Sequence, residues 1–248
     1  MKAMIFAAGL GTRLKPITDT MPKALVPVCG QPLLYHVITK LVAAGYDDLV
    51  VNVHHFPDQI IHYLHSHDFG ARIAVSDERD FLRETGGGIR DAAPLLGSEP
   101  FLVHNVDIVS NLDLGWLREQ HREGALVTLV ASERKTQRYF LFDEDNRLKG
   151  WTNIATGEVR SPFPDIDPDR CRKLAFAGIH LMSPAIFDAF DRYGFGDRFS
   201  IVDFYLRACA DYPIYAAVPP DFTLVDVGKR ETLAEAERIF QQIKDQQI

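Results

Sequence analysis

The stretch AAGLGTRLKPITDTMPKALVPV, Ala7–Val28, follows the short apolar run Ala3–Phe6 and places two glycines, an arginine and two lysines directly after it. Glycines that follow a strand let backbone N–H groups approach an anion closely. Arg13 can hold a phosphate by paired hydrogen bonds, and Lys15 and Lys23 add point charges. Lys23 stands in a largely apolar segment, which costs free energy unless an anion or a carboxylate meets it. We therefore expect a phosphate-binding turn here, rather than a surface turn with solvated charges.

The residues around this stretch alternate between the hydrophobic periods of strands and helices. Strands are expected at 2–7, 48–53, 71–76 and 101–104, and helices at 32–44, 58–65 and 87–96. Strands with near-continuous apolar centres, joined by helices, indicate a parallel sheet that is covered on both faces. The sequence therefore predicts a three-layer α/β/α fold. Ligands of such sheets bind at the carboxyl ends of the strands, where both the glycine stretch and the segment HNVDIVSN, 104–111, are expected to lie.

The second half of the chain is less regular and more antiparallel in character. Strands are expected at 125–132, 139–142, 147–151, 174–182, 214–218 and 223–227, and helices at 114–121, 201–210 and 230–244. Residues 152–172 are rich in proline, aspartate and glycine, which predicts a long loop or flap. Because no repeat or linker separates the two halves, we expect one domain, 1–248, with a mixed, mostly parallel central sheet.

The composition argues against several classes of protein. The chain has 248 residues, of which 46% are hydrophobic, so it can bury a sizeable core. Its net charge of −7 argues against a nucleic-acid partner, and no apolar stretch approaches the length of a membrane span. The widely spaced Cys29, Cys171 and Cys209 argue against a disulfide framework or zinc site and favour a reduced, cytoplasmic compartment.

Two other phosphate-binding motifs do not match the glycine stretch. No Gly-Lys-Ser/Thr follows at the spacing of a Walker loop. Gly9 and Gly11 fit the first two glycines of the dinucleotide fingerprint, but Leu14 stands where the third glycine should be. The pattern therefore argues against a dinucleotide-dependent oxidoreductase.

Longer motifs, in order along the chain, carry a resemblance to a known family. They are AAGLGTRLKPITDTMPKALVPVCGQPLL (7–34), ETGGGIRDAAPLLG (84–97), NVDIV (105–109), FAGIHLMSP (176–184) and LVDVGKRETLAEAE (224–237). Together they closely resemble the signature of the sugar-1-phosphate nucleotidylyltransferases, which implies their Rossmann-like, GT-A-like α/β fold. The triple glycine is most similar to short bacterial enzymes that uridylylate N-acetylmuramic acid 1-phosphate, and mannose-1-phosphate guanylyltransferases share much of the pattern.

The resemblance implies an enzyme that converts a nucleoside triphosphate and a sugar 1-phosphate to a nucleotide sugar and pyrophosphate. It implies UTP with N-acetylmuramic acid 1-phosphate or a related hexose 1-phosphate, in bacterial cell-wall and sugar-nucleotide biosynthesis. Residues 1–110 would bind the nucleotide and residues 111–248 the sugar phosphate, in a cytoplasmic monomer or homodimer without a membrane partner. A GTP-dependent mannose- or heptose-1-phosphate guanylyltransferase and a non-catalytic sugar-nucleotide sensor are the alternatives.

Several residues take roles through this resemblance. Arg13 would neutralise the departing pyrophosphate, and Lys23 would lie between the α-phosphate and the incoming sugar phosphate. Asp107 and Asp226 would hold Mg²⁺, which prefers carboxylate and phosphate oxygens. Alone, either aspartate could instead be a turn or helix-capping residue. The nucleotide-binding residues implied are Ala8, Gly9, Gly11, Thr12, Arg13, Lys23, Glu84, Gly86 and Gly87.

The candidates for the sugar-phosphate site are Asn105, Asn153 and Gly178. Gly178 lies in an expected strand without a side chain to pack, which suggests the close approach of a ligand or a simple bulge. Many relatives have Arg-Tyr-Gly where this chain has Phe140 in place of the glycine, and many carry a later Glu-Lys pair that is missing here. The sugar phosphate must therefore find its cation or hydrogen bonds elsewhere, and Asn153 and the flap are the candidates.

The glycines at 86–88 let the backbone lie against a flat ring. We expect Gly86 and Gly87 to contact the nucleobase, and the alternative is a loop that starts a helix.

Overall fold

The apolar run before the glycine stretch forms β1, Lys2–Phe6, within a group of parallel strands. In the computed structural model, which describes residues 1–229 and 231–245, β1 pairs with β4, Asp48–Val53, and with β6, Phe101–Asn105. β5, Arg72–Asp77, extends the group beyond β4. The ends of these four strands lie within one residue of the predicted ones, because unbroken apolar centres mark strands that are covered on both faces.

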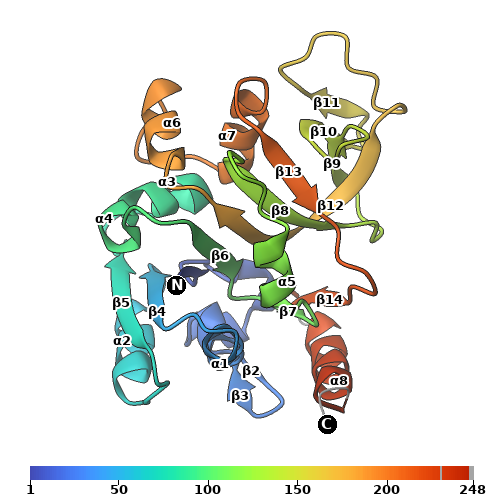
Figure 1. Ribbon diagram of the computed structural model, residues 1–248. Helices are drawn as coiled ribbons and strands as arrows, with labels where there is room; N and C mark the ends of the chain where they lie inside the picture. The colour runs from blue at the N-terminus through green and yellow to red at the C-terminus, as the bar shows by residue number, and fades with distance from the viewer. Residues whose placement is uncertain (230, 246–248) are drawn as a thin grey trace.

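The second half continues the same sheet through β12, Arg172–Met182, which lies antiparallel to β6. The strand order is β11-β10-β9-β12-β6-β1-β4-β5, and β8 joins β12 and β13 as a branch. The bounds of these strands are β8 Val127–Ser132, β9 Arg138–Phe142, β10 Leu148–Asn153, β11 Glu158–Arg160 and β13 Ile214–Ala217. The predicted α/β fold with a mixed central sheet is confirmed (Figure 1).

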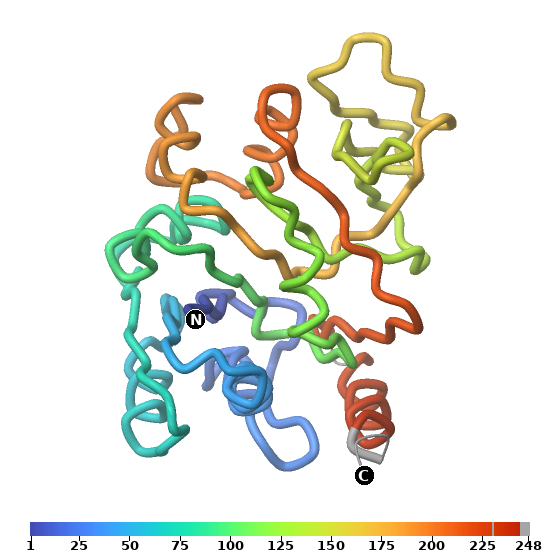
Figure 2. The backbone as a smooth tube through the Cα atoms, in the orientation of Figure 1, coloured from blue at the N-terminus to red at the C-terminus, as the bar shows by residue number. Residues whose placement is uncertain are grey.

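Part of the expected loop at 152–172 is a β-hairpin, so that prediction was wrong. β11 pairs antiparallel with the end of β10, with Trp151 opposite Arg160, and Gly157 takes a φ of 73° in the turn. The sequence hides this hairpin because all three residues of β11 are exposed and show no apolar alternation. The chain between β11 and β12 extends outward from the sheet edge (Figure 2, yellow and light orange).

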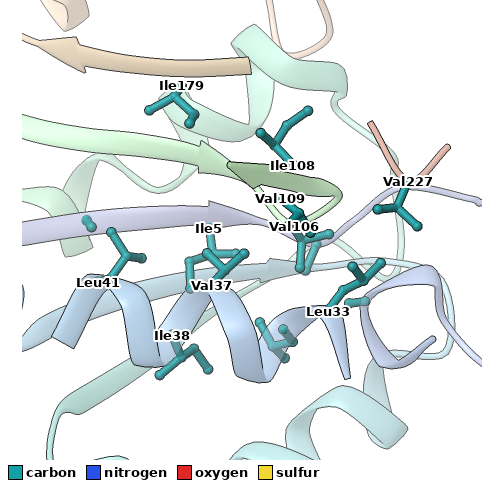
Figure 3. Close-up of a cluster of buried hydrophobic side chains, with 14 of the residues drawn as sticks. Ile5, Leu33, Val37, Ile38, Leu41, Val106, Ile108, Val109, Ile179 and Val227 are labelled. Carbon is teal, nitrogen blue, oxygen red and sulfur yellow. The ribbon is translucent and has the colours of Figure 1, made fainter. Parts of the chain in front are cut away.

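Helices cover both faces of the sheet. On one face α1, Leu33–Ala43, packs its apolar side against β1, as Ile5, Val37 and Leu41 show in Figure 3. Each fully buried side chain of this size contributes about 1.5–3 kcal/mol relative to exposure. Gly45, with a φ of 84°, follows α1 in the left-handed conformation, which glycine adopts readily at the ends of helices.

The other helices divide between the two faces according to the core that they join. The face of α1 also carries α2 Pro57–His65, α5 Leu114–Glu119 and α8 Glu231–Asp245, and the opposite face carries α3 Glu84–Asp91, α4 Ala93–Leu96, α6 Ile186–Arg192 and α7 Ile201–Ala208. Helix α6 has no counterpart among the expected elements. Arg230, the expected first residue of the last helix, lies outside the described residues.

A short ladder brings the end of the chain to the carboxyl end of β6. β7, Ile108–Ser110, follows β6 after one turn and pairs antiparallel with β14, Leu224–Asp226. A second short pair, β2 Pro27–Val28 with β3 Gln31–Pro32, closes the glycine stretch. Within the described residues, no helix has both the length and the apolar character that crossing a membrane requires.

Candidate active site at the carboxyl edge of the sheet

A cavity of about 390 Å³ opens where β1 and β6 end. Phe6, Ala8 and Gly9 line it after β1, and Asn105 and Asp107 line it after β6. The segment before and within α3 and the start of α7 contribute Leu82, Glu84, Thr85 and Ser200. This size is within the usual range for small-molecule sites, roughly 300–1,000 Å³. The predicted place for a ligand, at the carboxyl ends of the parallel strands, therefore holds a cavity.

The two glycines of the opening stretch have different environments. Gly9 is exposed, and a Cβ built on it would meet no atom within 4 Å, which leaves room for a ligand against the backbone. Gly11 takes a φ of 64°, and a Cβ there would lie 2.8 Å from Thr18 Cγ2. The Thr18 hydroxyl donates a 2.8 Å hydrogen bond to the Gly11 carbonyl. Gly11 thus shapes the turn, while the backbone at Gly9 stays open to the cavity.

Lys23 is buried to 8% exposure at the start of a 3₁₀ turn, Lys23–Leu25, and forms an ion pair with Asp107. The pair joins two residues that are far apart in the sequence. It supplies the carboxylate that a lysine in an apolar segment requires. Both side chains line the cavity.

Asp107 and Asp226 lie side by side across the β7–β14 ladder. The Val227 N–H donates a 2.8 Å hydrogen bond to the Asp107 carbonyl, and Asp226 is in register with Ile108. Partial burial and then the Asp107 charge raise the pKa of Asp226, while the charges of Lys23, Arg13 and Arg134 oppose that rise. Asp226 belongs to β14 and precedes α8 by several residues, so it does not cap that helix.

Arg13 reaches the same place from the glycine stretch. A Cβ built on Gly228 would lie 2.7 Å from Arg13 Nη2 and 2.7 Å from Asp226 Oδ1, so both side chains converge over this glycine. The structure thus brings together Arg13, Lys23, Asp107 and Asp226. Two adjacent carboxylates beside an open cavity fit Mg²⁺, a hard ion that commonly binds one or two protein carboxylates and takes phosphate oxygens and water as its other ligands. No cluster of three or more His, Cys, Asp or Glu side chains suited to a metal is found across 1–229 and 231–245.

The triple glycine lies within helix α3, and its close contacts are to the protein itself. A Cβ on Gly86 would lie 2.2 Å from the Phe199 ring, and one on Gly87 would lie 2.2 Å from the Asp197 carbonyl oxygen. The Gly86 N–H also donates a 2.8 Å hydrogen bond to the Phe199 carbonyl. Packing of α3 on the segment before α7 therefore requires these glycines. Gly86 and Gly87 are absent from the lining of the cavity, to which Glu84 contributes instead.

Glu84 has a φ of 62° and forms a 3.0 Å ion pair with Arg198. The pair ties the start of α3 to the segment before α7 at the cavity mouth. Thr12, the remaining nucleotide-site candidate, is exposed in the 3₁₀ turn Thr12–Leu14 beside Arg13.

A buried polar chain links the glycine stretch to this α3 segment. Asn52 Oδ1 accepts a 2.8 Å hydrogen bond from the Ala7 N–H, and Asn52 Nδ2 donates one of 2.8 Å to Glu78 Oε1. Glu78 Oε2 accepts from the Arg83 N–H at 3.1 Å. Burial raises the pKa of Glu78, and these hydrogen bonds counteract the rise. The sequence marks Asn52 as a polar residue inside an apolar strand, but it carries no signal for Glu78.

The candidates for the sugar-phosphate site separate in space. Gly178 takes a φ of 72° at a bulge between β12 and β8, and a Cβ there would lie 2.7 Å from Asn105 Nδ2. Gly178 thus lies at a bulge, where the absence of a side chain makes room for Asn105, which lines the cavity. Asn153 instead sits in the β10–β11 turn, where its Oδ1 accepts a 3.1 Å hydrogen bond from the Ala155 N–H, and it does not line the cavity. Phe140 is 2% exposed in the core.

Comparisons with known proteins place these features in a family context. Residues 2–145 match the family described as nucleotidyl transferase. The chain is 33% identical over 245 residues to an N-acetylmuramate alpha-1-phosphate uridylyltransferase of Caulobacter vibrioides, covering 95% of each chain. It is 30% identical over 194 residues to a mannose-1-phosphate guanyltransferase of Eremothecium gossypii, covering 76% of this chain and 51% of that protein.

Solved structures share the fold. HddC from Yersinia pseudotuberculosis, complexed with GMP-PN, superposes with a TM-score of 0.76 at 21% identity, covering 96% of this chain and 99% of that one. A UDP-glucose pyrophosphorylase complexed with UDP-glucose superposes with a TM-score of 0.78 at 18% identity, covering 97% and 98%.

Proposed function

This chain belongs to the nucleotidyl transferase family, and on that premise we propose that it is a sugar-1-phosphate nucleotidylyltransferase. The observation that carries the proposal is the convergence of Arg13, Lys23, Asp107 and Asp226 beside a cavity whose backbone is open at Gly9. Its substrates would be a nucleoside triphosphate and a sugar 1-phosphate.

The chemistry needs positioning and charge neutralisation more than a protein nucleophile. An oxygen of the sugar phosphate attacks the α-phosphorus, a new P–O bond forms, and the bond to the β-phosphate oxygen breaks as pyrophosphate leaves. Both reactants are anions, so their approach requires positive charge. Lys23 lies in the cavity wall where the two phosphates would meet, and Arg13 lies where it can neutralise the departing pyrophosphate.

Asp107 and Asp226 would hold Mg²⁺, which when bound would neutralise charge on the triphosphate. Asp107 also forms an ion pair with the mostly buried Lys23. The same carboxylate thus positions the lysine and would contribute a ligand to the metal.

UTP and N-acetylmuramic acid 1-phosphate are the substrates that we propose, because the relative with this activity matches almost the entire chain. A GTP-dependent mannose-1-phosphate guanylyltransferase is the second candidate, supported by the Eremothecium gossypii relative.

Release of pyrophosphate tests the proposal directly. The protein with Mg²⁺ would be given each of UTP, GTP, CTP, ATP and dTTP with a panel of sugar 1-phosphates. We expect turnover with UTP and N-acetylmuramic acid 1-phosphate, and its loss in Asp226→Asn. Lys15→Ala is a matched control, because Lys15 is an exposed lysine of the same stretch whose partner is Asp19. Preference for GTP and mannose 1-phosphate would favour the second candidate, and no turnover with any pair would indicate a non-catalytic sensor.

A further inference from the structure

A second cavity, of about 380 Å³, lies at the same edge of the sheet and has no part in the reaction as described. Ser132 and Arg134 line it after β8, Leu224 lines it from β14, and the middle of α8 closes it. β8 and β6 both run antiparallel to β12, so their carboxyl ends lie at one edge. Leu224 and Asp226 stand two residues apart on β14 and therefore point to the same face. The second cavity is thus a neighbour of the metal carboxylates.

Arg134 is held in place at this cavity. Its Nη2 donates a 3.0 Å hydrogen bond to the Phe176 carbonyl, at the β12 bulge that also contains Gly178. A guanidinium carries several donors in a fixed plane, so one bond orients the others for a planar acceptor such as a carboxylate.

A buried hydroxyl in the same lining has no partner. Ser132 is 9% exposed, and its Oγ forms no hydrogen bond with any of the described residues. Leaving such a group unpaired costs about 1–3 kcal/mol. Because this oxygen is almost fully covered by protein atoms, Ser132 shapes the wall of the cavity, and the accessible donors are those of Arg134.

The net charge of the side chains that line the second cavity matches a ligand group with a single negative charge. Arg134 and Arg238 are cationic and Glu235, one helical turn before Arg238, is anionic, so the three sum to one positive charge. A carboxylate carries one negative charge, whereas a phosphate monoester carries nearly two. The reacting phosphate already has Lys23 in the first cavity, and Arg13 lies next to Asp226 beside it.

We infer that the second cavity binds a carboxylate on the sugar ring, with Arg134 as its main cation, and so selects sugar 1-phosphates that carry an acidic substituent. The inference rests on the proposed function, since it places the sugar beside Asp226. It identifies a cationic residue of the sugar site in a sequence that lacks the Glu-Lys pair of many relatives.

The test compares N-acetylmuramic acid 1-phosphate with N-acetylglucosamine 1-phosphate, which has a hydroxyl in place of the lactyl ether and therefore lacks the carboxylate. We expect Arg134→Gln to lower the ratio of kcat/KM for the acidic over the neutral sugar about 10- to 100-fold, as loss of a charge-assisted hydrogen bond would. Lys135→Gln, the adjacent exposed cation, should leave the ratio unchanged. An unchanged ratio in Arg134→Gln would overturn the inference, including where both sugars lose activity equally.

Binding distinguishes this inference from the proposed function. Calorimetry with the same two sugar phosphates and the unmodified protein should show tighter binding of the acidic one, and Arg134→Gln should remove the preference. If this preference is observed without pyrophosphate release, the inferred carboxylate site in the second cavity is supported and only the proposed catalysis is refuted. Equal affinities of the unmodified protein for the acidic and the neutral sugar phosphate would refute the inferred carboxylate site, even if turnover is normal.

Discussion

Replacing Asn52 with alanine tests the buried chain that joins the glycine stretch to α3. The change removes the acceptor of the Ala7 N–H and the donor to Glu78, each at 2.8 Å. An unpaired buried N–H costs about 1–3 kcal/mol, and a lost hydrogen bond to a charged group costs about 1.5–3 kcal/mol. We therefore expect Asn52→Ala to lower the free energy of unfolding by about 3–5 kcal/mol. In a protein of this length that corresponds to a fall in Tm of about 6–20 °C.

The fall in the free energy of unfolding caused by Asn52→Ala should depend on pH, and the structure determines the direction of that dependence. Burial raises the pKa of Glu78 in the folded protein above its ordinary value of 4.5. The folded state then holds this proton more tightly than the unfolded state, so stability falls as pH rises through the interval between the two values. Asn52→Ala removes a hydrogen bond that favours the ionised form of Glu78. The difference in the free energy of unfolding between the variant and the unmodified protein should therefore grow above pH 4.5. Glu78→Gln, which removes the titrating group, should abolish this extra pH dependence.

Urea unfolding followed by circular dichroism between pH 4 and 8 would measure both effects, with Gln59→Ala as a control. Gln59 is exposed and its amide donates one 3.0 Å hydrogen bond to the Thr20 carbonyl. The control should change the free energy of unfolding by less than about 0.5 kcal/mol. A deficit below about 1 kcal/mol for Asn52→Ala, or one that narrows with rising pH, would refute the reasoning.

Three further predictions concern other parts of the molecule. Lys23→Ala should lower kcat about 10²- to 10³-fold, because it removes one preorganised charge contact; a near-normal rate of pyrophosphate release would remove Lys23 from the mechanism. Gly86→Ala should destabilise the protein by about 1–3 kcal/mol in thermal unfolding, because its Cβ would lie 2.2 Å from Phe199; an unchanged Tm would contradict this packing. Burial lowers the pKa of Lys40 to about 8, so the unmodified protein should gain stability relative to Lys40→Met as pH rises from 8 towards 10.5; urea midpoints that diverge in the opposite direction would refute it.

Much of the fold could be predicted from local patterns. The parallel strands and α1 were identified to within a residue or so, because burial on both faces of a sheet requires unbroken apolar runs and one buried helix face requires a 3.6-residue period. The β10–β11 hairpin was missed because β11 is exposed on both faces. The side chains of such a strand show no alternation of hydrophobic and polar residues, which is the pattern from which a strand is predicted.

The amino-acid sequence by itself determined that a cationic, glycine-containing turn follows β1 and that Lys23 needs an anionic partner. Both conclusions rest on residues close in sequence and on the cost of burying a charge. Only the tertiary structure decided that this partner is Asp107, that Asp226 lies beside it, and that the α3 glycines pack against Phe199. It also placed Asn153 in a turn outside the lining of the first cavity and Arg134 at a second cavity beside the carboxylates. Such contacts join residues that are far apart along the chain. They depend on which strands pair, and the residue type at a single position does not reveal its pairing partner.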